Sequence, residues 1–248
     1  MSKKDQNINI ICVDNIDSTN NFLKKLCIER FPDEGTVIMA EYQNAGKGQG
    51  KNSWHSKKGR NLLVSVLLKP SLNAIDHFLI SEFISMGIID TLAAYRIKSE
   101  IKWPNDIYVG DKKIAGILVE NSIKHNSIYQ TIAGIGLNVN EDDFPEYLPN
   151  PTSIYLEIKK ELNITELLKF LMNKLFERYK LIKGNDFQQL HNEYNSILYR
   201  KNISSGYNAA ADIFSAILIG VGTSGELQLK MEDGNIKEYL FGEVQMIV

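Results

Sequence analysis

The chain has 248 residues, of which 44% are hydrophobic and 23% are charged, and its 28 Lys and Arg residues nearly balance 30 Asp and Glu residues. A chain of this size buries enough apolar surface to fold without disulfides or metals, and its composition excludes extensive disorder. The formal net charge of −2 excludes an overall basic field of the kind that recruits nucleic acid.

The cysteines and the hydropathy pattern indicate a cytoplasmic protein, and the histidines do not indicate a metal site. Cys12 and Cys27 are the only cysteines, which suits a reducing compartment, and the four histidines show no pair at metal-ligand spacing. The N-terminal residues contain only a short apolar run, unlike a signal peptide, and no apolar stretch is expected to reach the ~20 residues of a membrane-spanning helix. We therefore expect a soluble cytoplasmic protein without a membrane partner.

The first hundred residues alternate strand and helix signals. Apolar runs predict strands over residues 8–13, 35–40 and 62–68, the last covered on both faces because it is almost wholly apolar. Four polar residues, 17–20, are expected to cap a helix that follows them. Residues 44–60, here called the glycine loop, hold four glycines and no periodicity. Helical spacing of apolar residues then predicts a helix over 78–95.

Strand signals dominate the middle and the end of the chain. Strands are predicted over residues 100–103, 107–109, 113–120 and 128–139, with a hairpin turn at Gly110-Asp111. Helices follow over 165–183, with Thr165 as cap, and over 187–199. From Ala211 onward, short strands separated by glycines are typical of a small β-barrel, with a boundary near residues 204–206. The chain thus divides into a mixed α/β domain, residues 1–203, and a β module, residues 204–248.

The glycine loop is the first candidate site. It carries several cations and no acid: Lys47, Lys51, Lys57, Lys58 and Arg60. Its glycines let backbone amides form a nest for a polyphosphate or carboxylate. The spacing fits neither a P-loop nor the dinucleotide fingerprint. A flexible surface loop with solvated lysines is the alternative interpretation.

Three strand-edge segments add polar groups. Pro104 keeps Trp103 extended, so Asn105 and Asp106 lie in a turn at a strand edge, where ligand groups collect; a simple Asn-Asp turn is the alternative. Lys113 stands at the mouth of an apolar strand and either reaches water or is held near an anion. Gly116 favours the close approach of a backbone or a ligand, and the two glycines and two asparagines of residues 134–140 indicate a ligand against that strand. The acidic run Glu141, Asp142, Asp143 and Glu146 is interpreted as a solvated turn.

Taken in order, these motifs resemble the biotin protein ligases. The matching segments are Ser18-Thr19-Asn20; Gln43 with Gly46-Lys47-Gly48 and Trp54; Lys102-Trp103-Pro104-Asn105-Asp106; Lys113 with Ala115-Gly116-Ile117; and Gly136-Leu137-Asn138. The resemblance implies an α+β fold, in which a mixed-sheet catalytic domain of the biotin/lipoate ligase (class II synthetase-like) type precedes a small SH3-like β-barrel. Fewer than ten residues precede the first predicted strand, so the resemblance is to monofunctional members without a DNA-binding domain.

The resemblance implies an ATP-dependent ligase. Such an enzyme makes biotinyl-5′-AMP from biotin and MgATP, releases pyrophosphate, and transfers biotin to one lysine of a biotin carboxyl carrier protein or domain of a carboxylase. ATP, Mg²⁺ and biotin are then the expected small molecules, with Mg²⁺ carried by ATP rather than by protein ligands, and DNA is not an expected partner. A lipoate–protein ligase or octanoyl transferase is the alternative enzyme, and a non-catalytic biotin- or nucleotide-binding regulator is the alternative outside enzymes.

The resemblance also assigns roles to residues. Lys113 is expected to bridge carboxylate and phosphate, and Asp106 to hold Lys113 or Lys102, or to help the acceptor amine. Biotin is expected to contact Ser18, Thr19, Asn20, Gln43, Lys47, Gly48, Gln49, Lys113 and Gly116. The adenylate is expected to contact Gly46, Lys47, Gly48, Trp54, Lys102, Asn105, Lys113 and Asn138. Family loops commonly read Gly-Arg-Gly-Arg, and here Lys47 and Gln49 replace the arginines, which predicts weaker retention of the adenylate.

Overall fold

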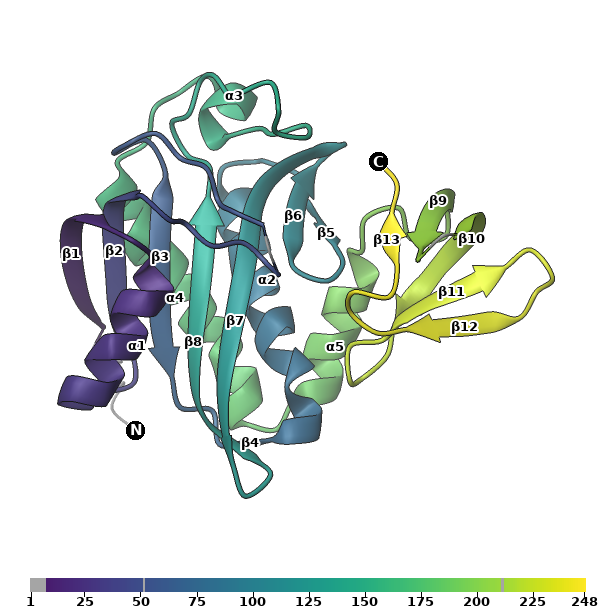
Figure 1. Ribbon diagram of the computed structural model, residues 1–248, viewed down its shortest axis with the longest axis horizontal. Helices are drawn as coiled ribbons and strands as arrows, with labels where there is room; N and C mark the ends of the chain where they lie inside the picture. The colour runs from purple at the N-terminus through teal and green to yellow at the C-terminus, as the bar shows by residue number, and fades with distance from the viewer. Residues whose placement is uncertain (1–7, 51, 211) are drawn as a thin grey trace.

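A large mixed sheet flanked by helices occupies most of the chain, and a smaller sheet follows at the C-terminal end (Figure 1). The computed structural model describes residues 8–50, 52–210 and 212–248. Two residues of the sequence analysis, Lys51 in the glycine loop and Ala211 at the start of the β module, lie outside the described residues.

The large sheet is parallel at one edge and antiparallel elsewhere. Its spatial order is β1 (Asn9–Ile16), β2 (Thr36–Gln43), β3 (Leu62–Leu68), β8 (Ser127–Leu137), β7 (Lys112–Lys124), β6 (Asp106–Val109) and β5 (Glu100–Lys102), with β4 (Leu72–Asn73) beside β8. Strands β1 and β2 are parallel, and the other neighbours along this order are antiparallel. The expected mixed sheet is confirmed.

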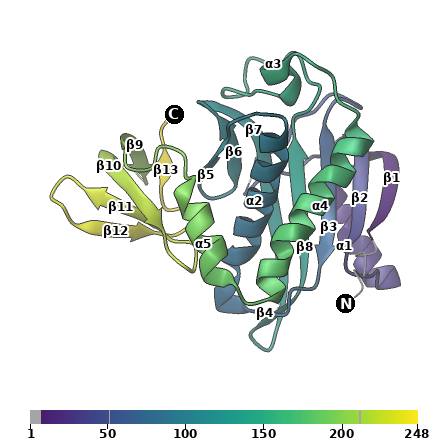
Figure 2. The ribbon, with the colours of Figure 1, turned by 180° about the vertical axis from the view of Figure 1, so that it is seen from behind.

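Helices cover both faces of this sheet. Helix α1 (Thr19–Arg30) packs on β2, β3 and β8 on one face (Figure 1). On the other face lie α2 (Phe78–Ala94), α4 (Ile164–Lys183) and α5 (Phe187–Ser196) (Figure 2), with the short α3 (Ile154–Ile158) and the 3-10 turn η1 (Ala74–Asp76) outside this layer. All residues of β3 are buried, as a strand covered on both faces requires.

Helix α2 is the central helix of the core. By length and composition, residues 74–94 would pass for a membrane-spanning segment, a length of apolar sequence that the sequence analysis did not expect. In the structure 67% of its most apolar window is buried inside the protein, against the sheet, α4 and α5. Its hydrophobicity is therefore used in packing.

The helix ends differ from their predicted caps. Ser18 stands at the N-cap position of α1, but its side chain makes no capping hydrogen bond. For α4, Asn163 rather than Thr165 is the cap, because its side chain accepts a hydrogen bond from the backbone N–H of Glu166 at 3.1 Å. The side chain of Ser18 is therefore not used to cap α1.

The second sheet is antiparallel, and its first strand begins at Ser204. Its order is β12 (Ile236–Tyr239), β11 (Leu227–Met231), β10 (Asp212–Val221), β9 (Ser204–Ala209) and β13 (Gln245–Met246). Gly225, with φ of +99°, lies against Phe78 of α2 so closely that a Cβ there would be 2.5 Å from its ring. Trp103 donates a hydrogen bond from Nε1 to the carbonyl of Gly225 at 2.9 Å. The second sheet is therefore joined closely to the large domain.

A buried contact between a carboxyl group and an imidazole lies at the same junction. Glu82 of α2 is fully buried, and its Oε1 is 2.6 Å from Nδ1 of His191 on α5. Asn195, one turn further along α5, bonds the backbone of Val221 in β10. Burial raises the pKa of Glu82, and the hydrogen bond to Glu82 raises the pKa of His191. The pair thus holds a proton that the unfolded chain gives up at lower pH.

Because the folded protein holds this proton, the free energy of unfolding of the wild type should decrease as pH rises. Because the pKa of folded His191 lies above its unfolded value near 6.5, its contribution is complete below that pH and is lost as pH rises through the folded pKa. Glu82→Gln removes the cause, so its free energy of unfolding should change less between pH 6.5 and 9 than that of the wild type. Urea unfolding at both pH values measures this, with exposed His77→Gln as control. Parallel pH dependences would contradict the pairing.

Candidate active site

A cavity of about 460 Å³ opens between the large sheet and the second sheet. Its lining comes from β2, the glycine loop, the β5–β6 turn, β7, β8 and the second sheet. Most of the predicted site residues line it: Ser18, Thr19, Asn20, Gln43, Lys47, Gly48, Gln49, Trp54, Lys102, Asn105, Asp106, Lys113 and Gly116. The fold thus brings together motifs that are far apart in the sequence.

Lys113 is held beside a carboxylate in this cavity. Its Nζ lies 2.6 Å from Oδ1 of Asp106, and both side chains are mostly buried. A bulge in the β6–β7 ladder pairs Tyr108 with Lys113 directly after Ile107 with Ala115, so the side chain of Lys113 reaches the face of Gly116. The side chain is therefore fixed by an anion, as one of the two sequence interpretations proposed.

A second lysine lies next to this pair. Burial lowers the pKa of Lys102, and the charges of Lys113 and Arg200 lower it further, against the opposing effect of Asp106. Its Nζ is also 5.3 Å from the centroid of the Tyr108 ring. With Lys47 at the rim, the described lining carries three lysines, Lys47, Lys102 and Lys113, against two acids, Asp106 and Glu243. An anionic ligand would relieve the repulsion among these cations.

At the other end of the cavity lies a chain of hydrogen bonds. Gln43 Oε1 accepts from the backbone N–H of Thr19 at 2.7 Å and from its hydroxyl at 3.1 Å. The Ser65 hydroxyl lies 2.7 Å from Thr19 Oγ1 and 2.5 Å from Asn20 Oδ1. Asn20 Nδ2 donates to Glu120 Oε2 at 2.9 Å. The charged end at Glu120 orients the amide of Asn20, so the chain presents a fixed pattern of donors and acceptors.

Ser65 and Glu120 were not identified from the sequence. Ser65 is the only polar residue of β3 and is completely buried. A hydroxyl at the centre of a strand buried on both faces needs a hydrogen-bond partner, which is the signal that points to it. Nothing comparable marks Glu120, since its role depends on a contact with a residue one hundred positions away.

The strand glycines receive side chains of the protein itself. A Cβ at Gly136 would lie 2.4 Å from Cε2 of Trp54, and one at Gly116 would lie 3.0 Å from its Cζ3. A Cβ at Gly134 would lie 2.5 Å from Asn20 Oδ1. Trp54 and Asn20 thus occupy part of the space above these glycines, which also line the cavity, and the expectation of a ligand against them stays a prediction. The indole of Trp54 lies on the floor of the cavity, where Lys113 Nζ is 5.6 Å from its ring.

Two predicted site residues do not line the cavity. Asn138 is buried, and its Nδ2 donates to the carbonyl of Thr152 at 2.9 Å. The segment it holds pairs with the backbone of Lys113, whose N–H donates to the Asn150 carbonyl at 2.8 Å. Gly46 lies beneath Trp54, whose N–H donates to its carbonyl at 2.9 Å. Both residues therefore support neighbours that line the cavity.

Gln49 and Asn105 differ in their hydrogen bonding. Asn105 Nδ2 is committed to the carbonyl of Ile117 at 2.7 Å. Gln49 Oε1 is buried and has no hydrogen-bond partner among the described residues. Gln49 lines the cavity, where a bound ligand can supply the missing donor.

The contact between Trp54 and Gly136 can be tested by fluorescence. In a Trp103→Phe background, Trp54 is the only indole, because the chain has two tryptophans. Gly136→Ala should displace the ring into water and shift its emission to longer wavelength, since a methyl group has no room there. Gly206→Ala is the control, because a Cβ at Gly206 meets only ordinary contacts of 3.5 Å or more. An unchanged spectrum in Gly136→Ala would contradict the contact.

Comparison with known proteins matches both the sequence and the fold. The model of the Biotin/lipoate A/B protein ligase family matches residues 12–138. The bifunctional ligase/repressor BirA of Salmonella typhimurium is 30% identical over 250 residues, which cover 96% of this chain and 74% of that protein. The BirA protein of Bacillus spizizenii is 28% identical over 236 residues, which cover 93% of this chain and 72% of that protein.

A solved structure matches nearly the whole chain. The biotin protein ligase from Aquifex aeolicus in complex with biotin and ATP superposes with a TM-score of 0.81 at 26% identity. The match covers 96% of this chain and 98% of that one, and so includes the second sheet.

Proposed function

The chain belongs to the biotin/lipoate A/B protein ligase family, and on that premise we propose how its cavity performs the reaction. The activity is ATP-dependent biotinylation, in which biotin is activated as biotinyl-5′-AMP and then transferred to a specific lysine of a biotin carboxyl carrier domain. The residue assignments rest mainly on the Lys113–Asp106 pair. In the same cavity, a hydrogen-bonding network lies on one side of this pair and further lysines lie on the other.

In the first step the biotin carboxylate attacks the α-phosphorus of ATP. A bond forms between a carboxylate oxygen and phosphorus, the bond to the bridging oxygen breaks, and pyrophosphate leaves. Two anions must approach each other, so a cation between them stabilises the transition state. Lys113 Nζ is our candidate for this position, because the substrates can replace Asp106 as its partners. In this proposal Mg²⁺ is bound by the phosphates of ATP and not by protein side chains.

The network at the far end suits the ureido ring of biotin. That ring offers two N–H donors and one carbonyl acceptor, which hydroxyl and amide side chains can match. Ser18, Thr19, Asn20 and Gln43 are the proposed partners, with Ser65 and Glu120 holding them in place. Gly116 and the glycine loop residues Lys47, Gly48 and Gln49 are assigned to the valeryl chain and the carboxylate.

The adenylate is assigned to the cationic side of the cavity. Trp54, Lys102 and Asn105 lie there with Lys113, and Asn138 and Gly46 support them from behind. Lys47 now bonds Asn21 Oδ1 at 2.7 Å, so it must leave that partner to reach a phosphate. Such a movement would close the glycine loop over the mixed anhydride and protect it from water.

In the second step the amine of the carrier lysine attacks the biotinyl carbonyl and AMP leaves. We assign Asp106 to orienting that amine or accepting its proton once Lys113 has turned to the phosphate, because the two side chains are in contact. We assign residues 1–203 to catalysis and residues 204–248 to closing the cavity, which Val244, Gln245 and Met246 line. A carboxylase carrier domain as partner, the absence of DNA binding and a cytoplasmic location stay predictions.

Replacing Lys113 tests the assignment. Lys113→Ala should lower pyrophosphate release with biotin and MgATP by at least about 100-fold, because one preorganised charge at a reacting oxygen is lost. Lys112→Ala, next to it but exposed, is the control. Wild type should release pyrophosphate with biotin and not with lipoate, which separates the two branches of the family. Release by Lys113→Ala near the wild-type rate would exclude Lys113 from this role.

Gln49 gives a second prediction. A neutral amide donates a weaker hydrogen bond to phosphate than a guanidinium does. Gln49→Arg should therefore slow the escape of biotinyl-5′-AMP severalfold, measured as biotin attached to lysines of an unrelated bystander protein. Asn44→Arg, which adds the same charge at an exposed loop position, is the control. Equal bystander labelling by Gln49→Arg and wild type would show that position 49 does not guard the intermediate.

A further inference from the structure

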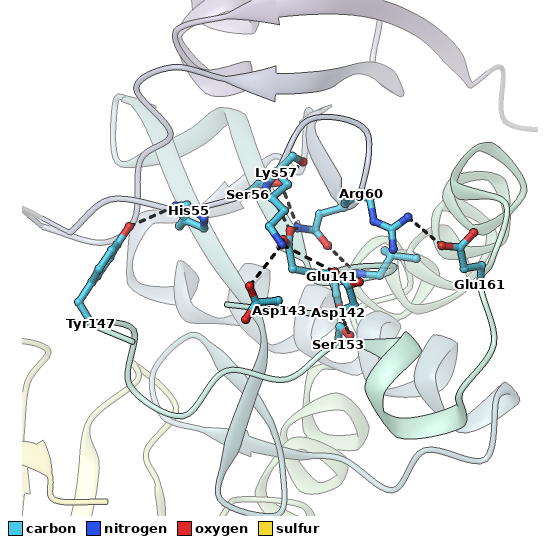
Figure 3. A network of polar contacts seen from close by, with 12 residues as sticks. His55, Ser56, Lys57, Arg60, Glu141, Asp142, Asp143, Tyr147, Ser153 and Glu161 are labelled. Atoms are coloured by element: carbon cyan, nitrogen blue, oxygen red, sulfur yellow. Dashed lines mark hydrogen bonds and ion pairs between the residues drawn. The ribbon is translucent and has the colours of Figure 1, made fainter. Parts of the chain in front are cut away.

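Glu141 is a buried carboxylate outside the cavity. It follows β8 and is fully buried, although the sequence suggests a solvated acidic turn. Its Oε2 accepts hydrogen bonds from the backbone N–H of Lys57 at 3.1 Å and from Asn61 Nδ2 at 2.6 Å. Its Oε1 lies 3.3 Å from Lys57 Nζ (Figure 3). Oε2 is thus hydrogen-bonded to two groups, whereas Oε1 makes no hydrogen bond among the described residues and is balanced by the charge of Lys57.

The groups that Glu141 touches belong to the end of the glycine loop. Lys57 is three residues after Trp54, the residue whose indole lies on Gly116 and Gly136. Asn61 continues the connection to the sheet, because its Oδ1 accepts from the Val139 N–H at 2.9 Å. Glu141 therefore fixes the loop end relative to the floor strand that Trp54 covers.

Glu141 also begins the next segment, residues 141–153. Ser153 Oγ donates to the Glu141 carbonyl at 2.5 Å, and Tyr147 OH lies 3.3 Å from His55 Nδ1. Figure 3 shows these side chains lying between the two segments. Segment 141–153 runs on beside Lys113, because Lys113 pairs with Pro151. One carboxylate thus links the segment that carries Trp54 to the segment that supports Lys113.

The charge of this carboxylate is balanced mainly by Lys57. Burial lowers the pKa of Lys57, but its hydrogen bond and charge interaction with Glu141, and the charges of Asp142 and Asp143, raise it to a higher net value. Those two acids lie 3.7 and 3.9 Å from Lys57 Nζ and are exposed. Lys57 therefore stays charged, and among the residues that the structure describes Glu141 is its one buried partner.

We propose that Glu141 is a positioning residue, which acts through Lys57 and Asn61 to set the place of Trp54 and so the closure of the glycine loop on the adenylate. The proposal rests on the proposed function for its kinetic part. It requires no contact between Glu141 and a substrate. It predicts that removing the negative charge of Glu141 releases the end of the glycine loop at Lys57 and leaves the apolar core packed.

Glu141→Gln tests this, because Gln keeps the shape and one acceptor but loses the charge that holds Lys57. We expect KM for ATP to rise roughly tenfold while kcat for pyrophosphate release stays within about threefold, as for a misplaced binding group. Escape of biotinyl-5′-AMP should rise with it. Glu161→Gln is the matched control, since it breaks an exposed pair with Arg60 (2.7 Å) at the same loop end.

Lys57→Gln and the double variant separate positioning from simple loss of stability. If the pair acts as one unit, each single variant and the double variant raise KM for ATP to the same extent. Additive effects, or a lower melting temperature with unchanged KM, would overturn the proposal.

A fluorescence measurement, which needs no enzyme activity, tests the role of Glu141 separately from the proposed function. In the Trp103→Phe background, Glu141→Gln should shift Trp54 emission to longer wavelength and Glu161→Gln should not. An unchanged emission in Glu141→Gln overturns the positioning role even if the enzyme is active. Absence of pyrophosphate release from wild type and control overturns the proposed function instead.

Discussion

The bulge in the β6–β7 ladder determines where the central cation of the cavity lies. In a regular strand, residues three apart point to opposite faces, so Lys113 and Gly116 would be on different sides of the sheet. The extra residue in β7 puts both on one face, with Lys113 Nζ 3.4 Å from the position of a Cβ on Gly116. Asp106, opposite Gly116 in the ladder, then meets the amine. The rest of the site is arranged around this pair.

Close approach to the sheet requires that its floor carry no side chains. Gly116, Gly134 and Gly136 weaken β7 and β8 locally, and burial of those strands between helices offsets that cost. Because these positions lack a Cβ, the side chains of Trp54 and Asn20 contact the backbone of β7 and β8 directly. The polar chain through Ser65 is possible for the same reason, because an otherwise apolar strand surrounds it and excludes competing water.

Much of this was predictable because apolar periodicity depends only on near neighbours. The strands around residues 62–68 and 128–139 and the helix over 78–95 were placed correctly, and the ordered motifs named most of the cavity lining. Contacts between distant segments were not foreseen. Asn138 turned away from the cavity to hold Thr152, and Glu141 was buried by Lys57 and Asn61 rather than solvated. Such pairings leave no pattern among neighbouring residues. The bulge in β7 also interrupts the alternation of side chains between the two faces of a strand, from which the facing of Lys113 would be inferred.

The close packing of Gly225 on Phe78 has a consequence for unfolding. Phe78 also packs edge-on against Tyr194 of α5, and buried side chains of the second sheet, among them Leu218 and Leu227, belong to the same apolar cluster as α2. Separating the sheets would hydrate both sides of that cluster at once. We therefore expect heat or denaturant to open the cavity wall and the central helix together rather than in two separate transitions.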